Sequence, residues 1–324
     1  MIRKLRQKLF FVLIAAALTV SAQERSYTRP KVRAITAFVR LVPASQQHEI
    51  AAALSVLRGA KGEFEKQGYE VETLRIVTQP LPELVGGQPE TQALAYLKSL
   101  DELGSKENFI PNLGPAMMRD TDDPRSMRLL EKALATLPNL QASTVIADDD
   151  GIHWKVIRET AALVHYLTEH SPNSQGSFGF TATAMLKPYG PFYPGAYHTG
   201  AGRQFSIGFE GANVVQEVFA RTRGDFAGSV AELTRQLTVH AKVAEAIGQR
   251  VAAANGWTYM GVDPTPAPLG DVSIGAAIST VCSAQFIPMD APLDGYRRWP
   301  ARSGRVTGSK ATPAGAGTLS RWSR

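Results

Sequence analysis

Between residues 31 and 281 the chain alternates segments that have the period of a β-strand with segments that have the period of an α-helix. Helical spacing is clear at Ile50, Leu54 and Leu57, whereas residues 31–41 are rich in the β-branched and aromatic side chains of a strand. Strands that alternate with helices predict an α/β fold whose sheet is largely parallel, with the helices outside. Residues 23–296 have the length of one such domain.

The predicted strands are 31–41, 71–78, 109–110, 143–147, 178–186, 204–209 and 257–262, and the predicted helices are 45–67, 90–103, 123–137, 151–170, 212–220, 230–254 and 270–281.

Residues 1–22 have the pattern of a signal peptide. Four basic residues precede a largely apolar run from Leu9 to Val20, and small residues follow at Ser21 and Ala22. A membrane-spanning helix needs about 20 apolar residues, so this run is too short to remain as an anchor. We expect cleavage near Ala22, a periplasmic or secreted protein, and no stable membrane anchor after cleavage.

Residues 297–324 contain seven basic residues and no acidic ones, and few apolar residues. This composition predicts a disordered basic tail, because such a segment cannot bury enough surface to offset its loss of conformational entropy. The two ends carry the chain's positive charge, and residues 23–296 hold 24 basic and 29 acidic residues, a formal net charge of −5. Nucleic acid is therefore not an expected partner.

Cys282 is the chain's single cysteine, so the sequence offers no internal disulfide and no cysteine-based zinc cluster. Its apolar surroundings favour a small buried thiol over a nucleophile.

His198 is the first candidate site residue. It follows a loop stiffened by Pro191 and Pro194 and made permissive by Gly190 and Gly195. A histidine held in this way can act as a general acid or base, or bind a metal, near neutral pH. The alternative is a histidine that only holds the loop through hydrogen bonds.

Glu210 and Asp263 are the other two candidates, because each ends a predicted strand. Ligands of α/β proteins bind at the carboxyl ends of the strands, so we expect both carboxylates to meet His198 there as catalytic partners. For Glu210 the alternative is a carboxylate that interacts with the following helix N-terminus. Asp271, which could cap a helix, is interpreted as structural.

Several familiar sites are not indicated. Asp148, Asp149 and Asp150 lack the spacing of a calcium loop, and they are interpreted as solvated residues that compensate a helix dipole. The histidines do not form a zinc-protease motif, and no phosphate-binding glycine loop or serine elbow is present. The sequence therefore predicts no metal and identifies no cofactor, and it leaves the oligomeric state open.

Four motifs resemble the domain-of-unknown-function 711 (DUF711) family, which is related to uncharacterised protein family 0210. They are residues 32–38, 191–198, 205–210 and 261–267, and the likeness extends over about residues 31–284. The resemblance implies a pyruvate formate-lyase-like α/β barrel and implies no known activity.

Members of that family continue beyond the position of Cys282 with further helices and barrel strands, where this chain has its basic tail. From this difference we expect a barrel that is incomplete at the C-terminus, through a truncated or frameshifted reading frame. Residues 305–309 resemble a glycyl-radical motif, but they lack its aromatic residue and are interpreted as a chance match.

The sequence thus predicts an exported protein, an enzyme that uses His198 in acid–base chemistry on a small polar molecule. The first alternative is a non-catalytic periplasmic protein that binds a small molecule with the same residues. The second is an inactive, truncated member of the family.

Overall fold

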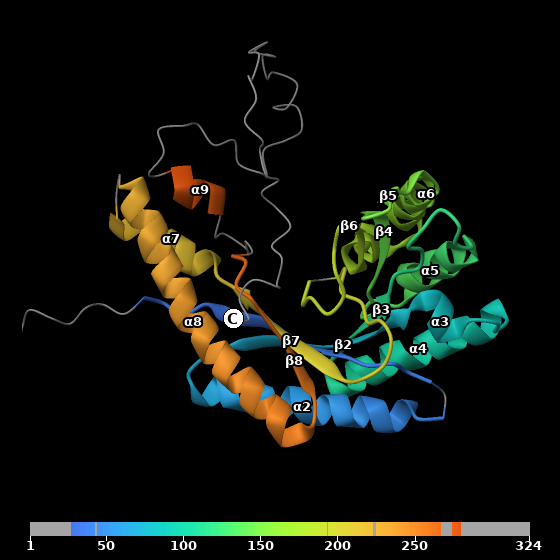
Figure 1. Ribbon diagram of the computed structural model, residues 1–324. Helices are drawn as coiled ribbons and strands as arrows, with labels where there is room; N and C mark the ends of the chain where they lie inside the picture. Colours follow the sequence, from blue (N-terminus) through green and yellow to red (C-terminus); the bar gives the residue numbers. More distant parts are fainter. Residues whose placement is uncertain (1–26, 43, 193, 223–224, 267–273, 280–324) are drawn as a thin grey trace, which may run out of the picture.

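The computed structural model describes residues 27–42, 44–192, 194–222, 225–266 and 274–279, and strands alternate with helices along them (Figure 1). In chain order the elements are β1 (Lys31–Phe38), α2 (Gln46–Lys66), β2 (Val71–Pro80), α3 (Leu81–Val85), α4 (Glu90–Glu107), β3 (Ile110–Gly114), α5 (Arg125–Thr136), β4 (Ala142–Asp148), β5 (Gly151–Ile152), α6 (Trp154–His170), the 3₁₀ segment η1 (Pro172–Gly179), β6 (Phe180–Ala184), β7 (Gln204–Glu210), α7 (Ala212–Thr222), α8 (Phe226–Asn255), β8 (Thr258–Asp263) and α9 (Ile274–Ser279).

Five strands form a sheet in the order β3-β2-β1-β7-β8. Strands β1, β2 and β3 are parallel to one another, and β7 is parallel to β8. Between these groups β7 pairs antiparallel with β1, so that Glu210 lies opposite Lys31 and Gln204 lies opposite Phe38. The carboxyl ends of β7 and β8 are therefore at the opposite edge of the sheet from the carboxyl ends of β1–β3.

A second sheet, in the order β5-β4-β6, continues the first. Strand β4 is joined to β3 by backbone hydrogen bonds from Leu113 N to Gln141 O (2.7 Å) and from Gln141 N to Pro111 O (3.0 Å). Together the two sheets form a curved wall, with β8 and β6 as its outer strands in the part of the chain that the structure describes (Figure 1).

The main hydrophobic core lies between one face of this wall and the helices. Helix α2 contacts β1, β2 and α8, and α4 contacts β3 and α5. Ile35 of β1, Leu57 of α2 and Phe205 of β7 are fully buried in this core. Burial of each such side chain stabilises the fold by about 1.5–3 kcal/mol, so the core fixes the helices against the sheet.

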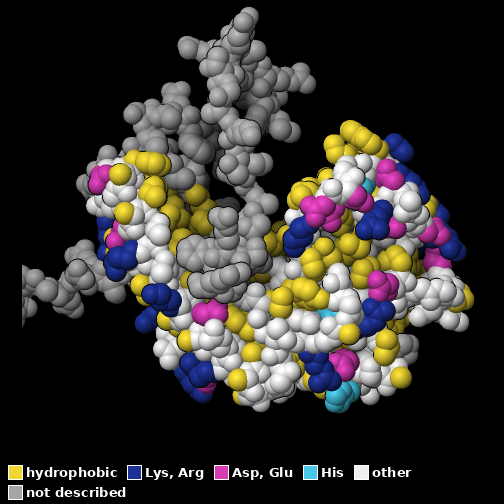
Figure 2. All heavy atoms as spheres, in the orientation of Figure 1, with side chains coloured by type: hydrophobic (Ala, Val, Ile, Leu, Met, Phe, Trp, Pro, Cys, Tyr) yellow, Lys and Arg dark blue, Asp and Glu magenta, His cyan; other side chains and the backbone are white. Residues whose placement is uncertain are grey.

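The other face of the wall carries smaller and more polar side chains, because alternate residues of a strand point to opposite faces. Thr36 of β1 and Ser206 of β7 are buried cross-strand neighbours on this face. Figure 2 shows the molecule hollowed between the side of α7–α8 and the side of α5–α6, with hydrophobic side chains on both walls.

The α/β fold with a parallel-rich sheet is confirmed. The signal peptide (1–22), the basic tail (297–324), Asp271 and Cys282 lie outside the described residues. Among the helices that are described, none has the length and apolar character needed to cross a membrane.

Candidate functional site

His198 lies in the loop between β6 and β7, which covers the carboxyl ends of β2 and β3. Its backbone N–H donates to Thr78 O (3.1 Å), and Asn112 Nδ2 donates to Ala196 O (2.8 Å). The imidazole is fully buried, with Nε2 at 3.3 Å from Gly202 O, and the described residues provide no hydrogen-bond partner for Nδ1. Burial lowers the pKa of His198, so its ring is neutral at pH 7.

The backbone of the His198 loop has an uncommon conformation. Met185 and Tyr189 have φ values of 57° and 67°, which bulky residues rarely adopt. The Tyr189 ring packs edge-on against His198 and Phe38, with centroid distances of 5.6 and 5.5 Å, and its hydroxyl donates to Thr199 O. The buried imidazole therefore packs within its own loop, and the His198 backbone N–H joins this loop to β2.

Glu210 lies at the opposite edge of the sheet, beside the start of β1. Its side chain is buried, and burial and the neighbouring Glu72 carboxylate raise its pKa. Lys31 lies opposite Glu210 in the strand register, and its Nζ is 3.3 Å from Glu72 Oε1. Two carboxyl groups and an amine thus gather here, and the pair of acids favours retention of a proton.

Asp263 ends β8 and shapes the turn that follows it. Its Oδ1 accepts hydrogen bonds from the backbone N–H of Thr265 (3.0 Å) and from the Thr265 hydroxyl. This arrangement, in which an aspartate bonds to groups two residues on, is typical of a turn-forming side chain. The geometry therefore gives Asp263 a structural role in the described loop.

The expectation that His198 meets Glu210 and Asp263 is wrong. Asp263 and Gly208 are paired in the parallel register of β7 and β8, so Asp263 and Glu210 lie at one edge of the sheet. His198 bonds to Thr78 at the other edge, near Gln204 at the start of β7. The reason is the antiparallel β1–β7 pairing, which places the ends of β7 and β8 away from those of β1–β3.

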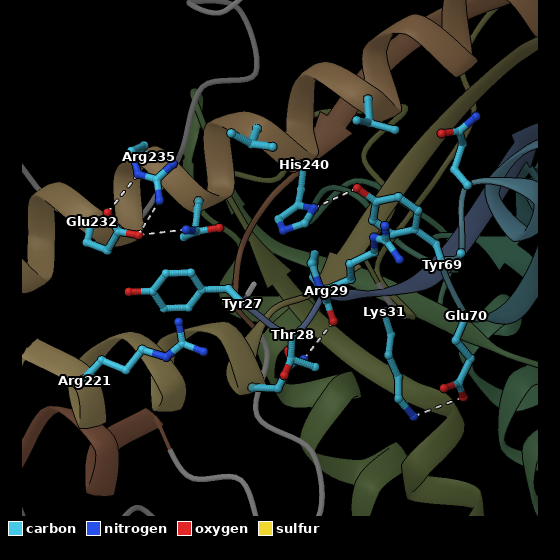
Figure 3. Close-up of a pocket in the computed structure, with 17 residues that line it drawn as sticks. Tyr27, Thr28, Arg29, Lys31, Tyr69, Glu70, Arg221, Glu232, Arg235 and His240 are labelled. Carbon is cyan, nitrogen blue, oxygen red and sulfur yellow. Dashed lines mark hydrogen bonds and ion pairs between the residues drawn. The ribbon is translucent and has the colours of Figure 1, made fainter. Parts of the chain in front are cut away.

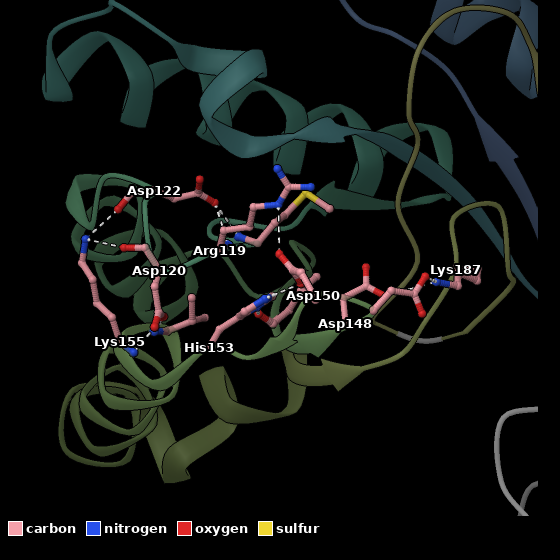
Figure 4. A network of polar contacts seen from close by, with 12 residues as sticks. Arg119, Asp120, Asp122, Asp148, Asp150, His153, Lys155 and Lys187 are labelled. Atoms are coloured by element: carbon pink, nitrogen blue, oxygen red, sulfur yellow. Dashed lines mark hydrogen bonds and ion pairs between the residues drawn. The ribbon is translucent and has the colours of Figure 1, made fainter. Parts of the chain in front are cut away.

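The acidic run at residues 148–150 is engaged in ion pairs (Figure 4). Lys187 Nζ lies 3.2 Å from Asp148 Oδ1 and 2.6 Å from Asp149 Oδ2. Asp150 Oδ1 lies 2.9 Å from Nε2 of the buried His153. Among the described residues, no group of three or more histidine, cysteine or acidic side chains is arranged to hold a metal ion.

A cavity of about 1070 Å³ lies between residues 27–31, the turn that precedes β2, and helices α7 and α8 (Figure 3). Its lining is mostly polar and consists of Tyr27, Thr28, Arg29, Pro30, Lys31, Gln67, Gly68, Tyr69, Glu70, Asn213, Arg221, Glu232, Arg235, Gln236, Val239, His240 and Val243.

One face of α8 forms a wall of this cavity. Glu232, Arg235, Gln236, Val239 and His240 follow one another at spacings of three, one, three and one, which places them on one side of a helix. The C-terminal half of the same helix packs on the core. The polar face near the middle of α8 therefore does not pack on the core, and it lines the cavity.

His240 is a buried titratable group in the cavity wall. Its Nδ1 lies 2.7 Å from the Tyr69 hydroxyl oxygen, and the residue is only 6% exposed. Its Nε2 has no hydrogen-bond partner in the part of the chain that the structure describes. Burial, and to a lesser extent the nearby Arg29 charge, lower the pKa of His240, so the ring is neutral at pH 7.

Carboxylates compensate some of the cations around the cavity. Lys31 Nζ lies 3.1 Å from Glu70 Oε1. Arg235 makes two hydrogen bonds of 2.8 Å to Glu232, and it lowers the pKa of Glu232 to about 2. These paired groups give the cavity wall fixed charges of both signs.

Two arginines of the cavity contact aromatic rings. The Arg221 guanidinium lies 4.0 Å from the centre of the Tyr27 ring, and Arg221 also pairs with Glu217. The Arg29 guanidinium lies 5.7 Å from the centre of the Tyr69 ring, and within the described residues it has no carboxylate partner. Arg29 thus brings an uncompensated charge to the ring that also holds His240.

Sequence reasoning did not identify His240 or this cavity. The sequence predicts only a helix for residues 230–254, and the polar stripe that ends at His240 is the signal that it offers for this cavity. Tyr69 and Arg29 gave no comparable signal, because they lie about 170 and 210 residues from His240 and meet it only in the folded chain.

The family model described as "Uncharacterised ACR (DUF711)" matches residues 26–286. A UPF0210 protein from Pyrobaculum aerophilum is 24% identical to this chain over 281 residues. The alignment covers 79% of this chain, and the chain spans 60% of the length of that relative.

Proposed function

This chain belongs to the DUF711 family, and we propose that its folded domain binds a small polar molecule in the cavity between residues 27–31 and α8. The observation that supports this proposal best is the buried His240, whose Nε2 has no partner among the described residues, in a cavity wall that is otherwise rich in paired polar groups. Buried polar atoms without a partner are rare, and a ligand is one of the groups that satisfies them.

The described side chains favour binding over acid–base catalysis by His198. Catalysis of that kind needs the imidazole within hydrogen-bond reach of the substrate and beside a partner group. His198 is fully buried, and Glu210 and Asp263 lie at the other edge of the sheet. The cavity, in contrast, combines open volume with hydrogen-bonding groups of both kinds.

The proposal is tested by screening a panel of metabolites for ligands that raise the melting temperature of the full chain. Val239 lines the cavity and is 47% exposed, so Val239→Trp should narrow the cavity and abolish the shift without disturbing the core. Val230→Trp is the control, because Val230 lies on the same helix, is 45% exposed and does not line the cavity.

A ligand whose effect persists in Val239→Trp would refute binding in this cavity. No ligand at all from a broad panel would favour an inactive member of the family instead.

We also propose export to the periplasm or the medium, which the composition of residues 1–22 supports. Expression with the native N-terminus, followed by N-terminal sequencing of the exported protein, should give Gln23 as the first residue. A protein that stays in the cytoplasm with its N-terminus intact would contradict the proposal.

The curved wall further supports a pyruvate formate-lyase-like barrel as the family's architecture. Two parallel groups of strands are joined by one antiparallel pair, and β8 and β6 are outer strands that further strands could join. A crystal structure of a longer relative should show additional strands between the counterparts of β8 and β6. A flat, open sheet there would refute the barrel.

A further inference from the structure

The bond between Tyr69 and His240 determines where the protons lie in the cavity wall. A neutral imidazole carries one N–H, and the other ring nitrogen accepts a hydrogen bond. The Tyr69 hydroxyl is buried, and its described partner is Nδ1 of His240. The Tyr69 hydroxyl hydrogen is used in this bond when Tyr69 donates it to Nδ1. Nδ1 is then the acceptor nitrogen, so the proton of the neutral imidazole is on Nε2.

Nε2–H of His240 is therefore a donor for which the described residues provide no acceptor. Figure 3 shows His240 extending from α8 toward residues 27–29, with one ring nitrogen bonded to Tyr69 and the other turned toward the labelled residues of the cavity wall, where that nitrogen is itself buried. A buried donor that lacks a partner is costly, so an acceptor atom of a ligand would bind favourably there.

Arg29 supplies positive charge at the same place. Its guanidinium and the imidazole of His240 both pack on the Tyr69 ring, at centroid distances of 5.7 Å each. Guanidinium groups form paired hydrogen bonds with carboxylates and phosphates, and no described carboxylate takes that role for Arg29. A donor and an uncompensated cation thus lie beside one aromatic ring.

We infer that the cavity binds an anion, and that a carboxylate or phosphate oxygen of the ligand accepts from His240 Nε2–H while Arg29 neutralises its charge. The inference rests on the proposed function and names the chemical class of its ligand. Glu70 and Glu232, which also line the cavity, disfavour ligands with a large negative charge. A small molecule with a single acidic group fits best.

The inference is tested by calorimetric titration of the full chain with inorganic phosphate, with acetate, and with acetamide as the neutral counterpart of acetate, at constant ionic strength. We expect phosphate or acetate to bind, acetamide not to bind, and Arg29→Gln to weaken binding by about tenfold or more, the loss expected for a hydrogen bond to a charged group. His240→Gln should weaken it by a similar factor. Binding of phosphate alone or of acetate alone identifies the acidic group.

The controls are Arg250→Gln, at an exposed arginine of α8 outside the cavity, and His165→Gln, at an exposed histidine of α6. Each should leave the affinity within about twofold of the unmodified chain, within the usual range for surface changes. If His240→Gln unfolds the protein, Tyr69→Phe provides the test instead, because it keeps the imidazole but no longer fixes its proton on Nε2.

The inference would be overturned if acetamide and acetate bind equally well, or if neither phosphate nor acetate binds. It would also be overturned if Arg29→Gln and Arg250→Gln bind the anion with equal affinity. The proposed function is judged separately. A neutral metabolite whose effect is lost in Val239→Trp would leave the binding cavity intact while refuting an anionic ligand.

Discussion

The Tyr69 hydroxyl oxygen lies 2.7 Å from Nδ1 of His240, and this bond joins the turn before β2 to the middle of α8 across 171 residues of sequence. The two rings also meet edge to face, with their planes at 88°. Helix α8 is therefore tied to the N-terminal half of the sheet by a polar contact that borders a cavity.

Removal of this bond should destabilise the protein measurably. Tyr69→Phe deletes the hydroxyl and leaves the buried Nδ1 without a partner, which costs about 1–3 kcal/mol. Urea unfolding followed by circular dichroism would measure the loss. Tyr166→Phe is a suitable control, because Tyr166 stacks on His170 near the surface, and it should change stability by less than about 0.5 kcal/mol. Equal effects of the two changes would contradict a special role for the Tyr69–His240 bond.

The His198 loop should loosen when its attachment to β3 is removed. Asn112→Ala deletes the 2.8 Å bond from Nδ2 to Ala196 O, and we expect faster amide hydrogen exchange within residues 186–203 and a stability loss of about 1–2 kcal/mol. Asn139→Ala deletes a similar bond, from Nδ2 to Phe109 O (3.0 Å), away from the loop. Faster exchange of the loop in both variants would argue against a specific attachment through Asn112.

The substitution Glu210→Gln should change the free energy of unfolding more favourably at pH 7 than at pH 4. Burial and then Glu72 raise the pKa of Glu210, so the folded state retains a proton at a pH where the unfolded chain has lost it. Stability is therefore lost as the pH rises through the folded pKa, and a neutral glutamine avoids this loss. Denaturant titrations of Glu210→Gln and of the unmodified chain at pH 4 and pH 7 would measure this effect. A stability difference between the two proteins that is the same at both pH values would refute the prediction.

The class of fold could be predicted because it follows from local periodicity. Residues such as Ile50, Leu54 and Leu57 place one apolar face on α2, and this face packs on the sheet as expected. The direction of β7 could not be predicted in the same way, because periodicity carries no information about strand orientation. Parallel neighbouring strands are usually connected by a crossover helix, and the sequence predicts no helix between residues 187 and 203. This missing helix is the one indication that β7 is not parallel to the strands before it.

The candidate site shows the same limit. His198 was identified from its rigid loop, and the structure does place it in a constrained and buried position. Its separation from Glu210 follows from the orientation of β7, which the sequence pattern did not reveal. Tyr69 and His240 are contacts between distant segments, and single-residue signals in either segment are those of an ordinary helix or turn.

His153 should contribute stability that decreases as the pH rises above about 6.5, the usual pKa of histidine in an unfolded chain. The carbonyl of Val145, and then Asp150, raise the pKa of the buried His153, because both ring nitrogens lie 2.9 Å from oxygen acceptors. The folded state thus binds a proton more tightly than the unfolded state, and this contribution is complete below the unfolded pKa and is lost as the pH rises through the folded pKa.

The stability cost of His153→Gln should accordingly shrink when the pH is raised from about 5.5 to about 8.5, a range chosen around the reference value of histidine. Unfolding free energies of the variant and the unmodified chain at several pH values give this difference directly. A cost for His153→Gln that grows with pH would mean that the ring is neutral in the folded protein.

Two glycines in long helices should respond to alanine in opposite directions. A Cβ atom at Gly248 of α8 would lie 2.5 Å from Cε2 of the Tyr259 ring, whereas a Cβ atom at Gly62 of α2 would have no neighbour within 4 Å. Alanine favours a helix over glycine by up to about 1 kcal/mol, so Gly62→Ala should stabilise the protein by an amount of that order. At Gly248 the clash should outweigh this gain and destabilise the protein by about 1–3 kcal/mol, the usual cost of overpacking. Thermal and urea unfolding of both variants would measure the difference, and a stabilising Gly248→Ala would show that α8 is free to move away from β8.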